Sequence, residues 1–90
     1  MAIQVKLNKF IQQFTNNREV VEVKGHSVGE CLLDLIRQFP ALEGKLIGKN
    51  SKLLSYIEIF VNQESAYPNE LAKPVSDGDV IHITQLIDGG

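Results

Sequence analysis

The chain has 90 residues and a formal net charge of −2 at pH 7, with 43% hydrophobic and 22% charged residues. This length fits one domain that folds around a single core without metal or disulfide staples. The acidic balance argues against a nucleic-acid partner, which normally meets a basic face, and no apolar run is long enough to span a membrane.

The first predicted strand begins almost at the start of the chain. Ile3, Val5 and Leu7 alternate with polar residues, as in a strand with one buried face. The residues before this alternation lack the basic head and the apolar run of a secretory signal peptide. We therefore expect a cytoplasmic protein, small enough to be a monomer when free.

A second strand follows after a polar connection. Residues 9–17 are interpreted as a loop that ends in a turn at Asn16-Asn17, because asparagine tolerates turn conformations. Val21 and Val23 then alternate with polar residues. We expect this strand to pair antiparallel with the first one as a hairpin.

The next element, residues 27–39, is predicted as the main helix. Ser27 and Glu30 have the spacing of a capping box, in which each side chain accepts a hydrogen bond from the other residue's backbone N–H. Pro40 ends the helix, because the residue before a proline is pushed out of the helical region. One face carries the apolar residues and should lie on a sheet: Val28, Cys31, Leu32, Leu35, Ile36 and Phe39.

Cys31 is the only cysteine, which excludes a disulfide framework within the chain and a zinc site built on several cysteines. A free thiol is a candidate for handling sulfur. Cys31 lies on the apolar stripe of the helix, however, where a free cysteine behaves as a small core residue. We expect a structural role for it.

Residues 41–55 are predicted as a long connection between the helix and the third strand. Leu42, Leu46 and Ile47 indicate partial packing, and residues 48–52 indicate an exposed tip. Ile57, Ile59 and Val61 then make a strand that faces the core.

The remaining chain is predicted to be a turn at residues 62–64, loops with at most a short edge strand, and a last strand. Asp77-Gly78-Asp79 forms a turn in which the short polar side chains bond locally to the backbone. Ile81 and Ile83 face the core in the last strand.

Three residues are candidates for docking a partner. If the alternating isoleucines face the helix, Phe60 points off the opposite face of the sheet, where Val80 and His82 also point. Aromatic side chains are enriched in the cores of interfaces. The alternative is that the loop at residues 9–17 covers Phe60. A metal site is not expected, since His26 and His82 have no other ligand at a suitable spacing.

The sequence ends with Gly89-Gly90. Glycine has no Cβ, so two in succession leave a thin, adaptable backbone that fits a narrow active-site tunnel. A carboxylate on such a backbone can be activated with ATP and then attacked by a nucleophile. The alternative is that these glycines are ordinary terminal disorder.

Together these features resemble the β-grasp sulfur carriers of the ThiS/MoaD family, which are ubiquitin-like. The resemblance covers the whole chain and is carried by the capped helix, the strand at residues 57–61 followed by Asn62, the turn at residues 77–79 and the final Gly-Gly. Residues 40–43 and the connection after them resemble the longer members. The resemblance implies an α+β, ubiquitin-like β-grasp: a mixed sheet of four or five strands with one main helix across one face. The first and last strands should be adjacent and parallel.

The resemblance also implies a chemistry. An ATP-dependent activating enzyme similar to ThiF or MoeB adenylates the carboxyl group of Gly90, and sulfur from a donor replaces AMP to leave a thiocarboxylate. The thiocarboxylate then gives its sulfur to an acceptor synthase. Ile87, Asp88 and Gly89 would form the segment that passes into these enzymes. The chain itself is then not an enzyme and binds no cofactor.

On this resemblance, residues 1–85 form the β-grasp domain and residues 86–90 a flexible tail. The sulfur could serve thiamine thiazole, molybdopterin, cysteine or homocysteine synthesis, or tRNA thiolation. Molybdopterin-type carriers usually have Pro-Pro where this chain has Gln85-Leu86, which disfavours that outlet. Two other functions stay open: a ubiquitin-like modifier joined through Gly90 to lysines, and a non-covalent β-grasp adaptor.

Overall fold

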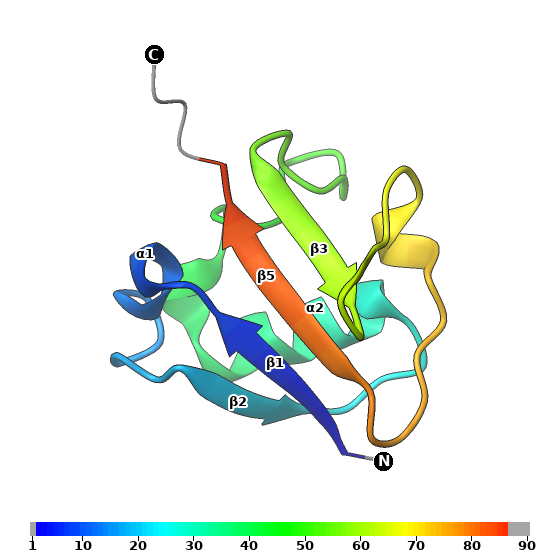
Figure 1. Ribbon diagram of the computed structural model, residues 1–90. Coiled ribbons are helices and arrows are strands. Elements are labelled where there is room, and N and C mark those ends of the chain that lie inside the picture. The colour runs from blue at the N-terminus through cyan, green and yellow to red at the C-terminus, as the bar shows by residue number, and fades with distance from the viewer. Residues whose placement is uncertain (1, 87–90) are drawn as a thin grey trace.

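The computed structural model describes residues 2–86, which form a five-stranded mixed sheet with one main helix across one face (Figure 1). The strand order in the sheet is β2-β1-β5-β3-β4. This is the predicted α+β architecture. In chain order the elements are β1 (Ile3–Leu7), α1 (Lys9–Gln12), β2 (Val20–Val23), α2 (Val28–Gln38), η1 (Pro40–Leu42), β3 (Ile57–Val61), β4 (Glu64–Ser65), η2 (Glu70–Ala72) and β5 (Val80–Gln85).

The two strands from opposite ends of the described chain, β1 and β5, lie side by side in the centre of the sheet. They run parallel, with Val5 opposite Ile81, as predicted. β2 pairs antiparallel with the outer side of β1, and β3 pairs antiparallel with the other side of β5, where Ile59 lies opposite Ile83. β5 is therefore paired on both sides from Ile81 to Ile83.

The start of α2 follows the capping prediction in one half and departs from it in the other. The Ser27 hydroxyl accepts a hydrogen bond from the Glu30 backbone N–H at 3.2 Å. The Glu30 carboxylate accepts from the N–H of His26 at 2.8 Å, so the predicted return bond to Ser27 is wrong. The carboxylate reaches back over the first turn to the residue before the cap, and it still satisfies an exposed donor there.

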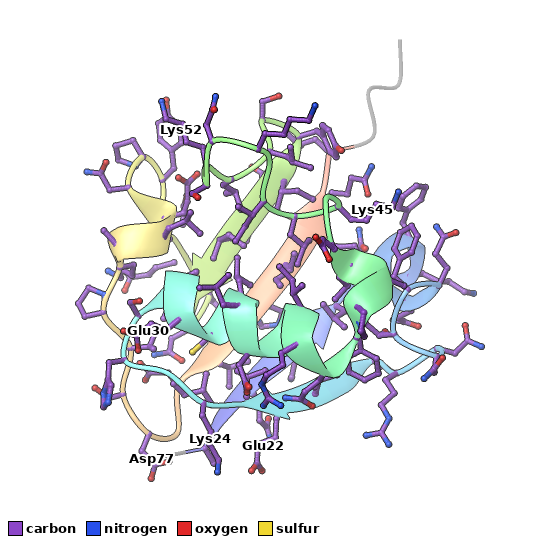
Figure 2. All side chains as sticks on the ribbon, turned by 180° about the vertical axis from the view of Figure 1, so that it is seen from behind. Glu22, Lys24, Glu30, Lys45, Lys52 and Asp77 are labelled. Carbon is purple, nitrogen blue, oxygen red and sulfur yellow. The ribbon has the colours of Figure 1, made fainter. Side chains whose placement is uncertain are left out.

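The core lies between α2 and the sheet. Figure 2 shows, from the helix side, the side chains that fill this space. Val28, Cys31, Leu32 and Leu35 of α2 have no exposed surface, and they pack with the buried residues of β1, β3 and β5. Ile36 and Phe39 of the predicted stripe pack at its margin and stay partly exposed.

Two connections contribute more buried residues to the core than the sequence patterns indicate. Residues 9–17 contain the short helix α1, which Asn8 caps by accepting the Ile11 N–H at 3.0 Å, and Ile11 is buried. Leu42 and Leu46 are fully buried, although only partial packing was expected. Leucines in a connection of mixed polarity show no periodicity, so their burial depends on tertiary contacts. Within residues 2–86, no helix is long and apolar enough to cross a membrane.

Candidate functional site

The C-terminal end of β5 is where the predicted tail begins. The N–H of Leu86 donates to the carbonyl oxygen of Tyr56 at 2.7 Å, so the pairing with β3 continues one residue beyond Gln85. The Leu86 side chain is 53% exposed. The predicted site residues Ile87, Asp88, Gly89 and Gly90 lie outside the described residues.

The three predicted docking residues come together on the face of the sheet opposite α2. Phe60 of β3 lies directly opposite His82 of β5, and Val80 is two residues away along β5. All three are partly buried. Figure 1 is seen from this face, with α2 behind the strands. A hollow of about 280 Å³ lies beside His82 and Val80 and is lined also by Lys6, Asn62 and Gln63.

The loop at residues 9–17 does not cover Phe60. Its helix α1 packs against β1 and β5, at the end of the sheet where β5 finishes (Figure 1). The partial burial of Phe60 follows from its own sheet neighbours, His82 and Ser65. Phe60, Val80 and His82 thus form a surface of apolar and imidazole groups, which we call the open-face patch.

The turn at residues 77–79 is built by hydrogen bonds. The Asp79 carboxylate accepts from the amide of Asn62 at 3.0 Å and from the Ser76 N–H at 2.8 Å. These two bonds lower the pKa of Asp79 from the ordinary value of 3.8. Gly78 has a φ of +92°, which glycine adopts without strain.

Asp77 of this turn bonds to the other end of the described chain. Its carboxylate accepts the N–H of Ala2 at 2.6 Å, and the N–H of Gly78 donates to the Ala2 carbonyl at 3.0 Å. The prediction of local bonding is therefore confirmed for Asp79 and wrong for Asp77. Figure 2 places Asp77 at the opposite end of the molecule from Lys45 and Lys52. This turn has a structural role, joining the start of β1 to the start of β5.

Cys31 is fully buried, in agreement with the expected structural role. Burial, together with the nearby carboxylates of Asp34 and Glu30, raises the pKa of its thiol to about 11. A reactive thiol needs exposure and a stabilised thiolate, and Cys31 has neither. Residues 2–86 contain no group of three side chains placed to hold a metal ion.

A further surface was missed by the sequence reasoning. A groove of about 570 Å³ follows the outer edge of β3 and reaches the end of β5. We call it the β3 groove. The adjacent Leu53-Leu54 pair and the Tyr67-Pro68 pair in a loop were available as signals. Its lining residues come from three stretches of the sequence, residues 53–59, 65–70 and 86: Leu53, Leu54, Ser55, Ile57, Glu58, Ile59, Ser65, Tyr67, Glu70 and Leu86.

Several solved structures have a fold similar to that of this chain. A chain in the crystal structure of the BexX/CysO complex of Amycolatopsis orientalis has a TM-score of 0.89 and 28% identity, covering 99% of this chain and 100% of that one. SAMP1 from Haloferax volcanii has a TM-score of 0.82 and 27% identity, with both chains fully covered. CysO of Mycobacterium tuberculosis has a TM-score of 0.84 and 24% identity, covering 94% of this chain and 99% of that one, and shows the shared fold.

These likenesses identify the fold as a ubiquitin-like β-grasp. No curated protein matches the chain by sequence. The sequence profile of the ThiS family matches residues 5–90, nearly the whole chain. The chain therefore belongs to the ThiS family of small β-grasp carrier proteins, which includes sulfur carriers and ubiquitin-like modifiers.

Proposed function

We propose that this protein carries sulfur as a thiocarboxylate on the carboxyl group of Gly90. The observation that supports this most directly is the ThiS family match, which extends over the β-grasp fold and through the final Gly89-Gly90. The reacting atoms are then the carboxyl carbon and oxygens of Gly90. Gly89, Asp88 and Ile87 would enter the active sites of the partner enzymes.

The proposed reaction has three steps. A carboxylate oxygen of Gly90 attacks the α-phosphate of ATP, which gives an acyl adenylate and releases pyrophosphate. Sulfide then attacks the carbonyl carbon, and AMP leaves with the electron pair of the broken C–O bond. If the donor is a persulfide, the same attack gives an acyl disulfide, and a further thiol cleaves its S–S bond to release the thiocarboxylate and form a disulfide with the donor. The resulting thiocarboxylate delivers its sulfur to an acceptor in a synthase. The carrier acts as a co-substrate, and its partners supply ATP, acids and bases.

The fold supports this use by fixing the base of the tail. β5 is held on both sides by β1 and β3, and the Leu86–Tyr56 hydrogen bond anchors the last described residue. Four residues span at most about 14 Å when fully extended. An activating enzyme that acts on Gly90 must therefore come within about that distance of Leu86, close enough to contact the folded domain.

The open-face patch is the proposed contact for such an enzyme. Phe60, Val80 and His82 lie on β3 and β5, the two strands that meet at the base of the tail. One similar protein was solved as the BexX/CysO complex, which supports a partner protein for this fold. We propose an activating enzyme of the ThiF/MoeB type as the first partner and a sulfur-acceptor synthase as the second.

A ubiquitin-like modifier is the second candidate function. It is favoured by 27% identity to SAMP1 of Haloferax volcanii, a protein named a small archaeal modifier. In this role the activated carboxyl group of Gly90 would form an isopeptide bond with a lysine of a target protein. Both functions use the same adenylation step and differ in the nucleophile that follows.

The decisive experiment compares the full chain with a variant lacking Gly89 and Gly90 in an adenylation assay with the ThiF-like enzyme of the same cells. We expect ATP–pyrophosphate exchange with the full chain and none with the shortened one. The intact mass of the protein from its native cells should show one oxygen replaced by sulfur. Heavier conjugates that require Gly90 would favour the modifier. If the shortened chain still bound its partner and supported sulfur transfer, the carrier and modifier functions would both be overturned. The non-covalent adaptor would then be the remaining function.

A further inference from the structure

We propose that the β3 groove binds an extended segment of the activating enzyme that carries apolar side chains and at least one lysine or arginine. This inference rests on the proposed function for the identity of the partner. It concerns a surface that adjoins the open-face patch on β3, where Glu58 lies two residues from Phe60 on the same face, and that extends to the outer side of β3. Three properties of the groove support it: its walls, its charge and its floor.

The walls of the groove are apolar and exposed. Tyr67 is 77% exposed and Leu86 is 53% exposed, and they are among the most exposed large hydrophobic side chains of residues 2–86. Leu53 and Leu54 pack partly against the core and line the same hollow. Apolar side chains gathered around a hollow of about 570 Å³ are typical of a surface that another molecule covers.

The charge of the groove selects the partner. Both charged side chains that line it within the described chain are acidic: Glu58, on β3, and Glu70, in η2. Neither forms an ion pair in residues 2–86. Asp88 and the proposed C-terminal carboxylate are also acidic, so the groove repels the chain's own tail. A segment with lysine or arginine is electrostatically complementary to it.

The floor of the groove is the main-chain edge of β3. The short strand β4 pairs only with Phe60 and Val61, so it leaves the first part of β3 at the edge of the sheet. The Ile57 N–H donates to the Leu54 carbonyl, and the Ile59 carbonyl accepts from Ala66. Among the residues described, the Ile57 carbonyl and the Ile59 N–H have no backbone partner on this side.

An extended segment can use these two groups. Peptides that add to an exposed sheet edge gain affinity from main-chain hydrogen bonds and specificity from alternate side chains in pockets. In the β3 groove, alternate side chains would contact Leu53 and Tyr67, and a basic side chain would meet Glu58 or Glu70. Because Leu86 lines the groove, a segment bound there lies directly beside the base of the tail. The interaction would therefore orient the carboxyl end toward the enzyme.

The first test uses two synthetic peptides, one of alternating valine and lysine and one of alternating valine and glutamate. In NMR spectra of the ¹⁵N-labelled full chain, the lysine peptide should shift the amide signals of residues 57–59 and Tyr67. It should also slow hydrogen exchange at the Ile59 N–H. The glutamate peptide should bind at least about tenfold more weakly. Absence of binding, or shifts confined to the open-face patch, would overturn the proposal.

Two matched double variants each replace two glutamates by lysines, one pair in the groove and the other far from it. The pair Glu58→Lys and Glu70→Lys should reverse the peptide preference. The control pair Glu19→Lys and Glu22→Lys makes the same change in net charge at the opposite edge of the sheet, and it should keep the original preference. An equal effect of both pairs would mean that only net charge matters, and the groove would have no specific role.

The second test measures adenylation by the ThiF-like enzyme. The Glu58→Lys and Glu70→Lys pair should raise KM for the carrier about tenfold and leave kcat nearly unchanged, while the control pair changes neither. If deletion of Gly89 and Gly90 abolishes exchange but the groove pair has the same KM as the control pair, the groove proposal is wrong and the proposed function stands. Exchange that survives the deletion would contradict the proposed function.

Two other occupants give distinct results. If the chain's own tail filled the groove, removal of residues 87–90 would shift the signals of residues 57–59 in the free protein. If a second copy filled it, sedimentation would show a dimer that Tyr67→Ser dissociates. Either result would overturn the proposal, which expects a monomer whose groove signals do not depend on the tail.

Discussion

Phe60 of β3 and His82 of β5 lie directly opposite each other on the face of the sheet that α2 leaves open. They are more than twenty positions apart in the sequence, with β4 and η2 between them, and the antiparallel pairing of β3 with β5 brings them together. Val80 continues the same row on β5. The arrangement places the aromatic ring of Phe60 beside the imidazole of His82, which is on the strand that leads to the tail.

Replacement of Phe60 by alanine should raise KM for the carrier in the adenylation assay about tenfold or more, since buried aromatic anchors dominate many interfaces. The control is Leu33→Ala, which removes an exposed side chain from α2 on the other side of the molecule. It should leave KM unchanged. Equal kinetics of the two variants would exclude a docking role for Phe60. Circular dichroism should show both variants folded.

The core role of α2 can be measured by Leu35→Ala. Leu35 has no exposed surface, so we expect a loss of about 2–5 kcal/mol in the free energy of unfolding, from lost burial and the cavity left behind. Leu33→Ala makes the same substitution at a side chain that is 61% exposed. It should cost less than about 1 kcal/mol in urea denaturation. Similar losses would mean that the buried stripe is misplaced.

Cys31 should be unreactive in the folded protein. Its thiol is buried and has a pKa of about 11, so at about pH 8 very little thiolate exists to attack a reagent. Iodoacetamide should therefore label the protein rapidly only in concentrated urea, as seen by mass spectrometry. Rapid labelling without urea would show that the helix opens readily. In that case Cys31 would again be a candidate for sulfur handling.

The pH dependence of stability should include a contribution from Asp79. Hydrogen bonds from Asn62 and Ser76 lower the pKa of its carboxyl group below 3.8 in the folded state. The stabilisation is therefore fully present above 3.8 and is lost as the pH falls through the lower, folded-state pKa. Asp79→Asn should lower the urea midpoint at about pH 7, and the difference from the parent should shrink toward about pH 2. Glu43→Gln, which removes an exposed acid, serves as the control. If the difference in urea midpoint between Asp79→Asn and the parent stayed constant with pH, the proposed contribution of Asp79 would be contradicted.

Gly89→Val tests the approach of the tail separately from its chemistry. The variant keeps the carboxyl group of Gly90, but a β-branched side chain stiffens and widens the backbone next to it. We expect ATP–pyrophosphate exchange to fall sharply and the urea midpoint to stay that of the parent. Gly89→Ala adds a smaller side chain and should lose less activity. Full activity of the valine variant would mean that the enzyme does not enclose this part of the tail.

Much of the fold could be predicted from the sequence because its signals are local. The alternation of Ile57, Ile59 and Val61 determines which face of β3 is buried, and Ser27 with Pro40 marks the two ends of α2. The parallel pairing of the first and last strands came from the family resemblance. Each local signal depends on residues within one turn or one strand, so no knowledge of the partner elements is needed.

The tertiary structure decided what depends on distant contacts. Leu42 and Leu46 are buried because the connection folds back onto the core, and Asp77 bonds to Ala2 because β1 and β5 start side by side. The β3 groove gathers Leu53, Tyr67, Glu70 and Leu86 from separate segments. No pattern in the sequence places these residues together, since their proximity follows from strand order and loop paths. The sequence by itself determined the elements and the Gly-Gly end, and the packing of those elements determined the surfaces around it.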